Sequence, residues 1–279
     1  MDEPLQVLIS ADMEGVAGIV HASETNPERY DYERGRRLVT AEVNAAIAGV
    51  FEAEPTAVVR VADAHGSYRN LLPEELDRRV TLIRGKPRAW GMLGGLTDKV
   101  DALLFIGYHG RAGSSPAVLA HTMTDALLDV RIDGRPMGEI GLNTLLAGSF
   151  GVPVVLLSGD DAAGAEFRDL VPEATVVEVK RSLGQTSAES LHPQEARERI
   201  QAATTIAIDG RDRVPVLRST GPVTVEVELH GPSAVELAML IPGIRRTAAA
   251  RTITFPARDM AEAYRLVQLL VQISQLKPT

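Results

Sequence analysis

Two carboxylates stand two positions apart, directly after a short apolar run near the start of the chain. The run 5–10 leads into the segment SADMEG, which carries Asp12 and Glu14 and then Gly15, where the backbone can turn without steric cost. Alternate residues of an extended segment point the same way. If the extended path continues past Ser10, both carboxylates can face one cation or an adjacent pair, so we expect a metal site to begin here.

Histidines follow two further apolar runs. His65 comes after the run 57–62, in the segment VADAHGS that also contains Asp63, and His109 comes after the run 101–107, in FIGYHGRAG. Ligands of open α/β sheets bind beyond the carboxyl ends of the strands. We therefore expect both imidazoles to lie on the same rim of a sheet as the first two carboxylates.

Two later residues complete the candidate group. His121, in AHTM, lies in a loop between predicted elements, and Glu139 begins a helical pattern. The candidate metal ligands are Asp12, Glu14, His65, His109 and Glu139. Imidazole and carboxylate together suit zinc or a similar divalent ion. These candidates are more ligands than one tetrahedral ion binds. Two ions about 3.5–4 Å apart that share a carboxylate and a water would use all of them.

Each residue also has an ordinary structural role. A lone acid often caps a turn, and Asp63 either does so or orients His65. The pair Asp160 and Asp161 follows another apolar run and is more typical of a helix N-cap than of a ligand. Polar contexts predict no ligand role for the remaining histidines, His21, His192 and His230. These residues alone leave the reaction open among hydrolyses, phosphoester hydrolysis included, and leave open a metal-dependent binding or assembly protein without turnover.

The elements that must position these residues follow from hydrophobic patterning. Apolar runs predict strands at 5–10, 57–62, 80–83, 101–107, 127–133, 152–157 and 176–179, the last as an edge strand. Apolar residues at helical spacing predict helices over 32–54 and 138–150. Short apolar strands that alternate with helices indicate an α/β fold, a mainly parallel sheet with helices on both faces.

The pattern changes after residue 181. We expect a polar helix over 193–204, a half-exposed strand over 224–229, a helix over 233–240, a strand over 251–255 and an amphipathic helix over 257–276. We therefore divide the chain into a metal-binding catalytic α/β domain, 1–181, and a smaller α+β domain, 182–279, which we expect to take part in oligomer contacts.

Composition excludes several classes of protein. The chain has 279 residues and a net charge of −8, which argues against a nucleic-acid partner because a phosphate backbone demands a basic surface. It has no cysteine, so disulfides and thiolate metal sites are excluded. No apolar segment approaches the ~18 residues that a membrane helix needs, and the acidic start does not resemble a signal peptide. We expect a cytoplasmic protein with no membrane partner.

Several ordered segments resemble the bacterial D-aminopeptidase family of DppA type. They are SADMEGVAG (10–18), YERGRRLVTAEVN (32–44), DAHG (63–66), FIGYHGRAG (105–113), AHTM (120–123), GRPMGEIGLN (134–143) and VPVVLLSGDDAA (152–163), with ARDMAEAY (257–264) near the end. They occur in family order, which makes the resemblance far more specific than any one segment.

The resemblance implies a zinc metallopeptidase with two zinc ions per subunit. Carried over motif by motif, the family's metal ligands fall on Asp12, Glu14, His65, His109 and Glu139, and its catalytic histidine falls on His121. It also implies a short peptide substrate with an N-terminal D-residue, such as D-Ala-D-Ala, and a ring of ten subunits. The segment 20–32 departs from the family pattern, so a different substrate specificity is expected if this segment borders the substrate pocket. An amidase or peptidase of this fold acting on another small amide or an L-peptide is the nearest alternative.

The mechanism expected from this reading uses hydroxide held by both ions. The hydroxide attacks the scissile carbonyl, whose oxygen rests on a zinc ion as Lewis acid. We expect Asp12 to bridge the ions. His121 is expected to protonate the leaving amine or to stabilise the tetrahedral intermediate by a hydrogen bond, because imidazole titrates near neutral pH.

Overall fold

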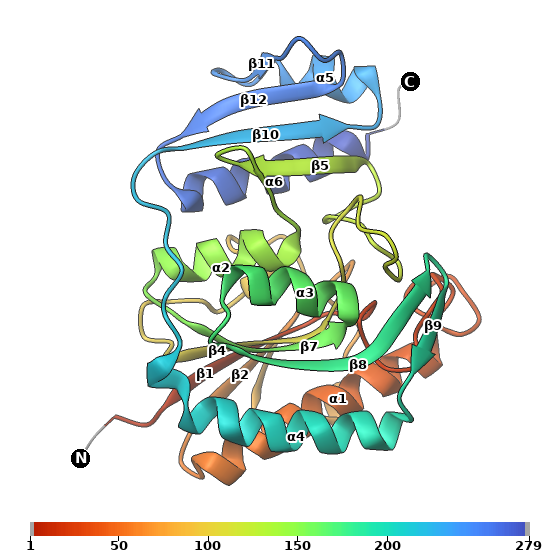
Figure 1. Cartoon of the computed structure of the whole chain (residues 1–279), viewed down its shortest axis with the longest axis vertical. Coiled ribbons are helices and arrows are strands. Elements are labelled where there is room, and N and C mark those ends of the chain that lie inside the picture. Colours follow the sequence, from red (N-terminus) through yellow and green to blue (C-terminus); the bar gives the residue numbers. More distant parts are fainter. Residues whose placement is uncertain (1–2, 277–279) are drawn as a thin grey trace.

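The computed structural model of the protein describes residues 3–276, which form two sheets with helices between and around them (Figure 1). The larger sheet has seven strands in the order β3-β2-β1-β4-β7-β8-β9. Its strands are β1 (Gln6–Ala11), β2 (Val58–Asp63), β3 (Thr81–Ile83), β4 (Ala102–Tyr108), β7 (Val154–Asp160), β8 (Thr175–Gly184) and β9 (Ser187–Ser190). All neighbours are parallel except β8 and β9.

Helices cover both faces of this sheet. One face carries α1 (Tyr32–Ala53) and α4 (Pro193–Asp209), which pack against each other, and the other carries α2 (Glu139–Ser149) and α3 (Asp161–Leu170) (Figure 1). Burial on both faces explains why the central strands are continuously apolar. Every residue of β4, ALLFIGY, is buried.

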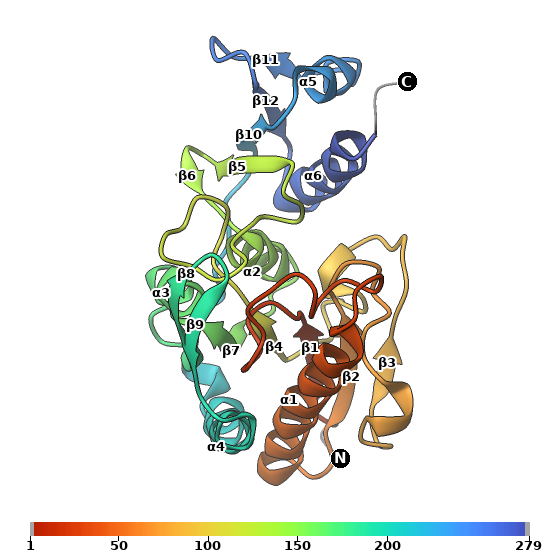
Figure 2. The ribbon, with the colours of Figure 1, turned by 90° about the vertical axis from the view of Figure 1, so that its right-hand side faces the viewer.

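The smaller sheet is antiparallel and has five strands in the order β11-β12-β10-β5-β6. Its strands are β5 (Leu127–Ile132), β6 (Arg135–Pro136), β10 (Val223–Leu229), β11 (Arg245–Arg246) and β12 (Thr252–Ala257). Helix α5 (Pro232–Ala238) packs on it, and α6 (Met260–Ser274) lies between this sheet and α2 (Figures 1 and 2). Short 3₁₀ helices span Pro73–Glu75, Gly91–Leu93 and Arg211–Arg213.

The predicted fold class is confirmed, since a mainly parallel sheet lies between two helical layers beside a smaller α+β unit. The edge-strand prediction at 176–179 is wrong, because β8 has β7 on one side and β9 on the other. The true edge strand, β9, reads SAES and carries no apolar signal. Among residues 3–276, no helix is both long enough and apolar enough to cross a membrane.

The predicted division at 181/182 does not coincide with the division between the sheets. Strand β5 precedes that boundary but pairs with β10 in the smaller sheet, and α4 follows it but packs on α1 beneath the larger one. Hydrophobic period identifies an element but not its partner, because pairing between distant segments leaves no local signal.

Candidate metal centre

The larger sheet brings three strand ends together. Strand β1 lies between β2 and β4, and all run parallel, so their carboxyl ends share one rim. Asp12 follows β1, His65 follows β2, and His109 follows β4 directly. The positions agree with the rule that ligands of open α/β sheets bind at this rim.

The two carboxylates of the first segment are presented by a tight turn rather than by a continued strand. Strand β1 ends at Ala11, and the amide of Gly15 then donates to the carbonyl of Gly107, 2.8 Å away. A Cβ atom on Gly15 would lie 1.8 Å from the carbonyl oxygen of Tyr108, so only glycine permits this approach. The extended path that the sequence suggested past Ser10 therefore stops one residue further on, yet Asp12 and Glu14 both reach the rim.

His65 contacts both of these carboxylates. Its Nδ1 lies 3.2 Å from Asp12 Oδ1 and 3.0 Å from Glu14 Oε2. Its Nε2 lies 3.0 Å from the carbonyl oxygen of Thr25, which fixes the ring with Nδ1 toward the carboxylates. All three side chains are largely removed from solvent.

His109 approaches the other oxygen of Asp12. Its Nε2 lies 3.5 Å from Asp12 Oδ2 and 3.7 Å from Glu139 Oε1, while its Nδ1 is held 3.0 Å from the carbonyl oxygen of Gly110. Asp12 thus stands between two imidazoles, one on each carboxylate oxygen. This is the geometry expected of a carboxylate that bridges two cations.

Glu139 and His121 close the cluster. Glu139 is the first residue of α2, and its Oε1 accepts a hydrogen bond from the amide of Met123 at 2.6 Å. His121 Nε2 lies 3.7 Å from the same oxygen, and Nδ1 lies 2.8 Å from the carbonyl oxygen of Leu119. The sequence-predicted residues therefore all lie in one cluster, while their roles as ligands and catalyst stay predictions.

The donor set fits a divalent metal. Glu14 Oε2 and His109 Nε2 are buried, and neither forms a hydrogen bond among the described residues, although His65 Nδ1 lies close to Glu14 Oε2. Such orphaned atoms are costly unless something else satisfies them. The potential ligand atoms form two groups, and within each group all of them lie within 4.8 Å of one another. The groups are Asp12–Glu14–His109 and His109–His121–Glu139. The second group shows that His121 is close enough to ligate a metal as well as to carry a proton.

The electrostatics of the cluster favour cations. Burial by itself would raise the pKa of Asp12, but the imidazoles of His109 and His65 beside its two oxygens outweigh burial and hold that pKa well below its usual range. Burial would likewise lower the pKa of each of these two imidazoles, yet the neighbouring carboxylates raise both well above 6.5. Burial raises the pKa of Glu139. Carboxylates dominate the local field, and a metal would displace the protons they hold on the imidazoles.

Other residues considered in the sequence have structural roles. Asp63 accepts hydrogen bonds from the amides of Asn70 and Leu71, and the side chain of Asn70 links it to the backbone carbonyl of His65. Asp160 is the N-cap of α3, as predicted, and accepts from the amide of Ala163. His192 caps α4, His21 bonds Ser23, and His230 is exposed.

Sequence reasoning missed two buried residues that hold the turn 12–19. Lys180, in β8, donates to the backbone carbonyls of Glu14, Val16 and Ile19, with Nζ 3.0 and 2.6 Å from the last two. Glu42, in α1, accepts from the amide of Ala17 at 2.8 Å. The available sequence signal was the lysine that ends the mostly apolar segment VVEVK (176–180), because a lysine buried in a strand requires polar partners.

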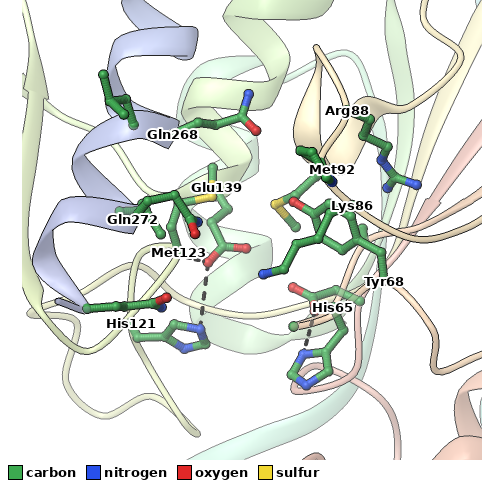
Figure 3. A pocket seen from close by; sticks show the side chains of 17 residues that line it. His65, Tyr68, Lys86, Arg88, Met92, His121, Met123, Glu139, Gln268 and Gln272 are labelled. Carbon is green, nitrogen blue, oxygen red and sulfur yellow. Dashed lines mark hydrogen bonds and ion pairs between the residues drawn. The ribbon is translucent and has the colours of Figure 1, made fainter.

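A cavity of about 520 Å³ opens from the cluster. Asp12, His65, His121 and Glu139 line its metal-centre end. Gln268 and Gln272 of α6 form the facing wall (Figure 3). A second cavity, of about 610 Å³, also borders His65 and His121 and includes Glu14 and Asp125. A ligand can therefore extend to both sides of the centre.

The chain is similar to known proteins along almost its whole length. The family model Peptidase M55, D-aminopeptidase, matches residues 5–269. The D-aminopeptidase of Bacillus subtilis (strain 168) is 33% identical over 270 residues, 97% of this chain and 98% of that protein. The solved structure of a Zn-dependent D-aminopeptidase, DppA from Bacillus subtilis, a self-compartmentalizing protease, matches with a TM-score of 0.95 at 32% identity and covers 99% of this chain and 100% of that chain.

The matches span both sheets and every residue of the cluster. The chain therefore belongs to the D-aminopeptidase family and is a peptidase, a hydrolase that acts on peptide bonds.

Proposed function

We propose that the protein is a zinc-dependent aminopeptidase that removes an N-terminal D-amino acid from short peptides of the D-Ala-D-Ala type. The family and the Bacillus relatives support the D-aminopeptidase activity and the choice of zinc. One observation carries the proposal for this chain. Asp12 meets His65 through one carboxylate oxygen and His109 through the other, beside buried ligand atoms without hydrogen-bond partners.

The proposed centre holds two zinc ions per subunit. Their ligands are Asp12, Glu14, His65, His109 and Glu139. Glu14 lies on the His65 side of Asp12 and Glu139 on the His109 side, which supports Asp12 as the bridging carboxylate. When bound, zinc supplies a water acidic enough to act as a nucleophile near neutral pH and a Lewis acid for the scissile carbonyl.

His121 is the proposed proton carrier. The carbonyl of Leu119 binds its Nδ1, which leaves Nε2 directed at the cluster, where the scissile bond must lie. From this position Nε2 can give a proton to the leaving amine or donate a hydrogen bond to the oxygen on which charge develops. The cavity lined by His121 has room for the residue that leaves.

The assembly proposed for this chain is a closed ring of ten subunits. The solved relative is a self-compartmentalizing protease, and its structure matches 99% of this chain. A chamber of that kind restricts substrates to short peptides. Light scattering should show a large particle, and a stable monomer at micromolar concentration would contradict the ring.

The activity is tested by a hydrolysis screen of the zinc-loaded protein against paired D- and L-dipeptides, their amides and a generic phosphoester. We expect D-dipeptides to be cleaved fastest. Faster cleavage of the L-dipeptide or of a simple amide would favour the alternative peptidase or amidase. Phosphoester cleavage alone would replace the proposal, and binding without turnover would indicate a metal-dependent binding protein.

A further inference from the structure

The 520 Å³ cavity joins the candidate metal centre to a wall that carries a lysine. Its metal-centre end carries the carboxylates Asp12 and Glu139. The wall formed by α6 contributes neutral amides, Gln268 and Gln272, and Lys86 lines the cavity on the side opposite α6 (Figure 3). A short peptide whose scissile bond lies at the metal centre can therefore direct its C-terminal carboxylate toward the lysine.

Apart from the histidines, two cationic side chains line the cavity, Lys86 and Arg88. One of them, Arg88, is engaged in hydrogen bonds within the protein. The guanidinium of Arg88 donates to the backbone carbonyls of Asp63, Ile83 and Gly91 and stacks 4.1 Å from the centre of the Tyr68 ring. Each of its three nitrogens thus donates to a backbone carbonyl, which makes Arg88 a residue that ties the loop to the sheet.

Lys86 keeps its charge available. Within residues 3–276 its ammonium forms no ion pair and no hydrogen bond, and its recorded contact is with the Tyr68 ring, 5.5 Å from the centroid. Lys86 is an exposed residue that lines the cavity, and its side chain extends into the pocket (Figure 3). A cation at this place can be reached by a carboxylate that enters with the substrate.

The backbone that carries Lys86 is nevertheless fixed. The amide of Gly85 donates to the carbonyl of Tyr68 at 2.6 Å, and Arg88 anchors the other side of the loop. Ordering the free side chain is then the main entropic cost of binding, because the loop itself is already placed.

We propose that Lys86 binds the α-carboxylate of the residue that leaves, so that the enzyme prefers dipeptides with a free C-terminus over amides and longer peptides. The proposal rests on the aminopeptidase function proposed above. The leaving residue then lies in the 520 Å³ cavity between Met92 and Met123, and the residue with the free amine lies toward the second cavity. Lys86 acts on specificity and takes no part in bond cleavage.

The test compares D-Ala-D-Ala with its C-terminal amide in the zinc-loaded protein. We expect the native protein to prefer the free acid, and Lys86→Ala to lower the acid-to-amide ratio of kcat/KM about tenfold, mainly through KM for the acid, since that is the usual value of one charge-assisted hydrogen bond. Lys86→Arg should retain most of the preference. Lys99→Ala removes an exposed lysine just before β4, outside the cavity, and should leave the ratio unchanged.

Equal losses on acid and amide in Lys86→Ala, or no native preference for the acid, would overturn the role of Lys86. If no peptide is cleaved, the aminopeptidase function fails, and calorimetric binding of the same acid and amide still decides the question of Lys86. Tighter binding of the acid that disappears in Lys86→Ala supports the proposal, whereas equal or absent binding contradicts it. Thermal melting of each variant shows that it folds.

Discussion

The imidazole rings of His109 and His121 stack, with their centroids 4.3 Å apart and their planes 12° from parallel. His109 follows β4 directly, and His121 lies in the loop before β5. The stack, with the bond to Leu119, fixes the ring of His121 beside Glu139. A group that must move a proton benefits from being held in this way before the substrate arrives.

Replacement of His121 separates its two possible roles. We expect His121→Ala to keep the zinc content of the native protein and to lose about 10²–10⁴-fold in kcat, the usual value of general acid catalysis. Metal analysis and kinetics on the same preparation check this. His230→Ala, at an exposed histidine after β10, is the matched control. A parallel loss of zinc would make His121 a ligand, and full activity would remove it from the mechanism.

Metal content tests the cluster itself. We expect about two zinc ions per native subunit and fewer in His109→Ala, because His109 belongs to both groups of neighbouring ligand atoms. Treatment with a chelator should abolish peptide cleavage, and added zinc should restore it. Full activity in metal-free protein would contradict the centre.

Lys180 should matter for both stability and metal binding. Lys180→Met keeps the side-chain volume but leaves the buried carbonyls of Glu14, Val16 and Ile19 without their donor. We expect the free energy of unfolding to fall by about 3 kcal/mol, as when one partner of a buried polar cluster is removed, and zinc to bind more weakly because Glu14 is displaced. Urea denaturation and zinc titration measure the two effects.

The neighbouring Arg181 supplies the control for that experiment. Its side chain is exposed and pairs with the exposed Glu189 at 2.6 Å, and such pairs contribute at most about 1 kcal/mol. Arg181→Ala should therefore change stability and zinc affinity little. Comparable losses in both variants would mean that Lys180 has no special role.

Glu42 should make stability depend on pH. Burial raises the pKa of Glu42 from 4.5 to about 7, although the amide of Ala17 and the charges of Lys180 and Arg197 oppose the shift. The folded state therefore favours the protonated carboxyl, whose stabilising contribution is complete below pH 4.5 and is lost as the pH rises through 7.

Glu42→Gln removes this ionisation but keeps an oxygen that can accept from Ala17. Relative to the native protein, the variant should gain stability between pH 5 and 8, by up to about 3 kcal/mol at the upper end. Urea denaturation at the two pH values gives the difference, in which the titration of other groups cancels. A constant difference across this range would contradict the shifted pKa.

The sequence predicted that the candidate residues lie together better than it predicted the arrangement of the elements. Asp12, His65 and His109 were found because each follows an apolar strand, and parallel strands end on one rim. The placement of β5 in the smaller sheet left no comparable signal, because its partner β10 lies far along the chain. No local signal identified Lys86 or Gln268 either. Both line a cavity that forms only when α6 packs against α2.

Two of the three passages of the chain between the two sheets carry candidate site residues. One runs from β4 to β5 and contains His109 and His121, and another runs from β6 into α2 and delivers Glu139. An added tag, loop or domain should not be inserted into either of these two passages. One extra residue in either of them would shift His109, His121 or Glu139 from the cluster. The turn between β8 and β9 calls for the same care, because Gln185 and Thr186 line the second cavity and the carbonyl of Gln185 accepts a hydrogen bond from the amide of Leu119.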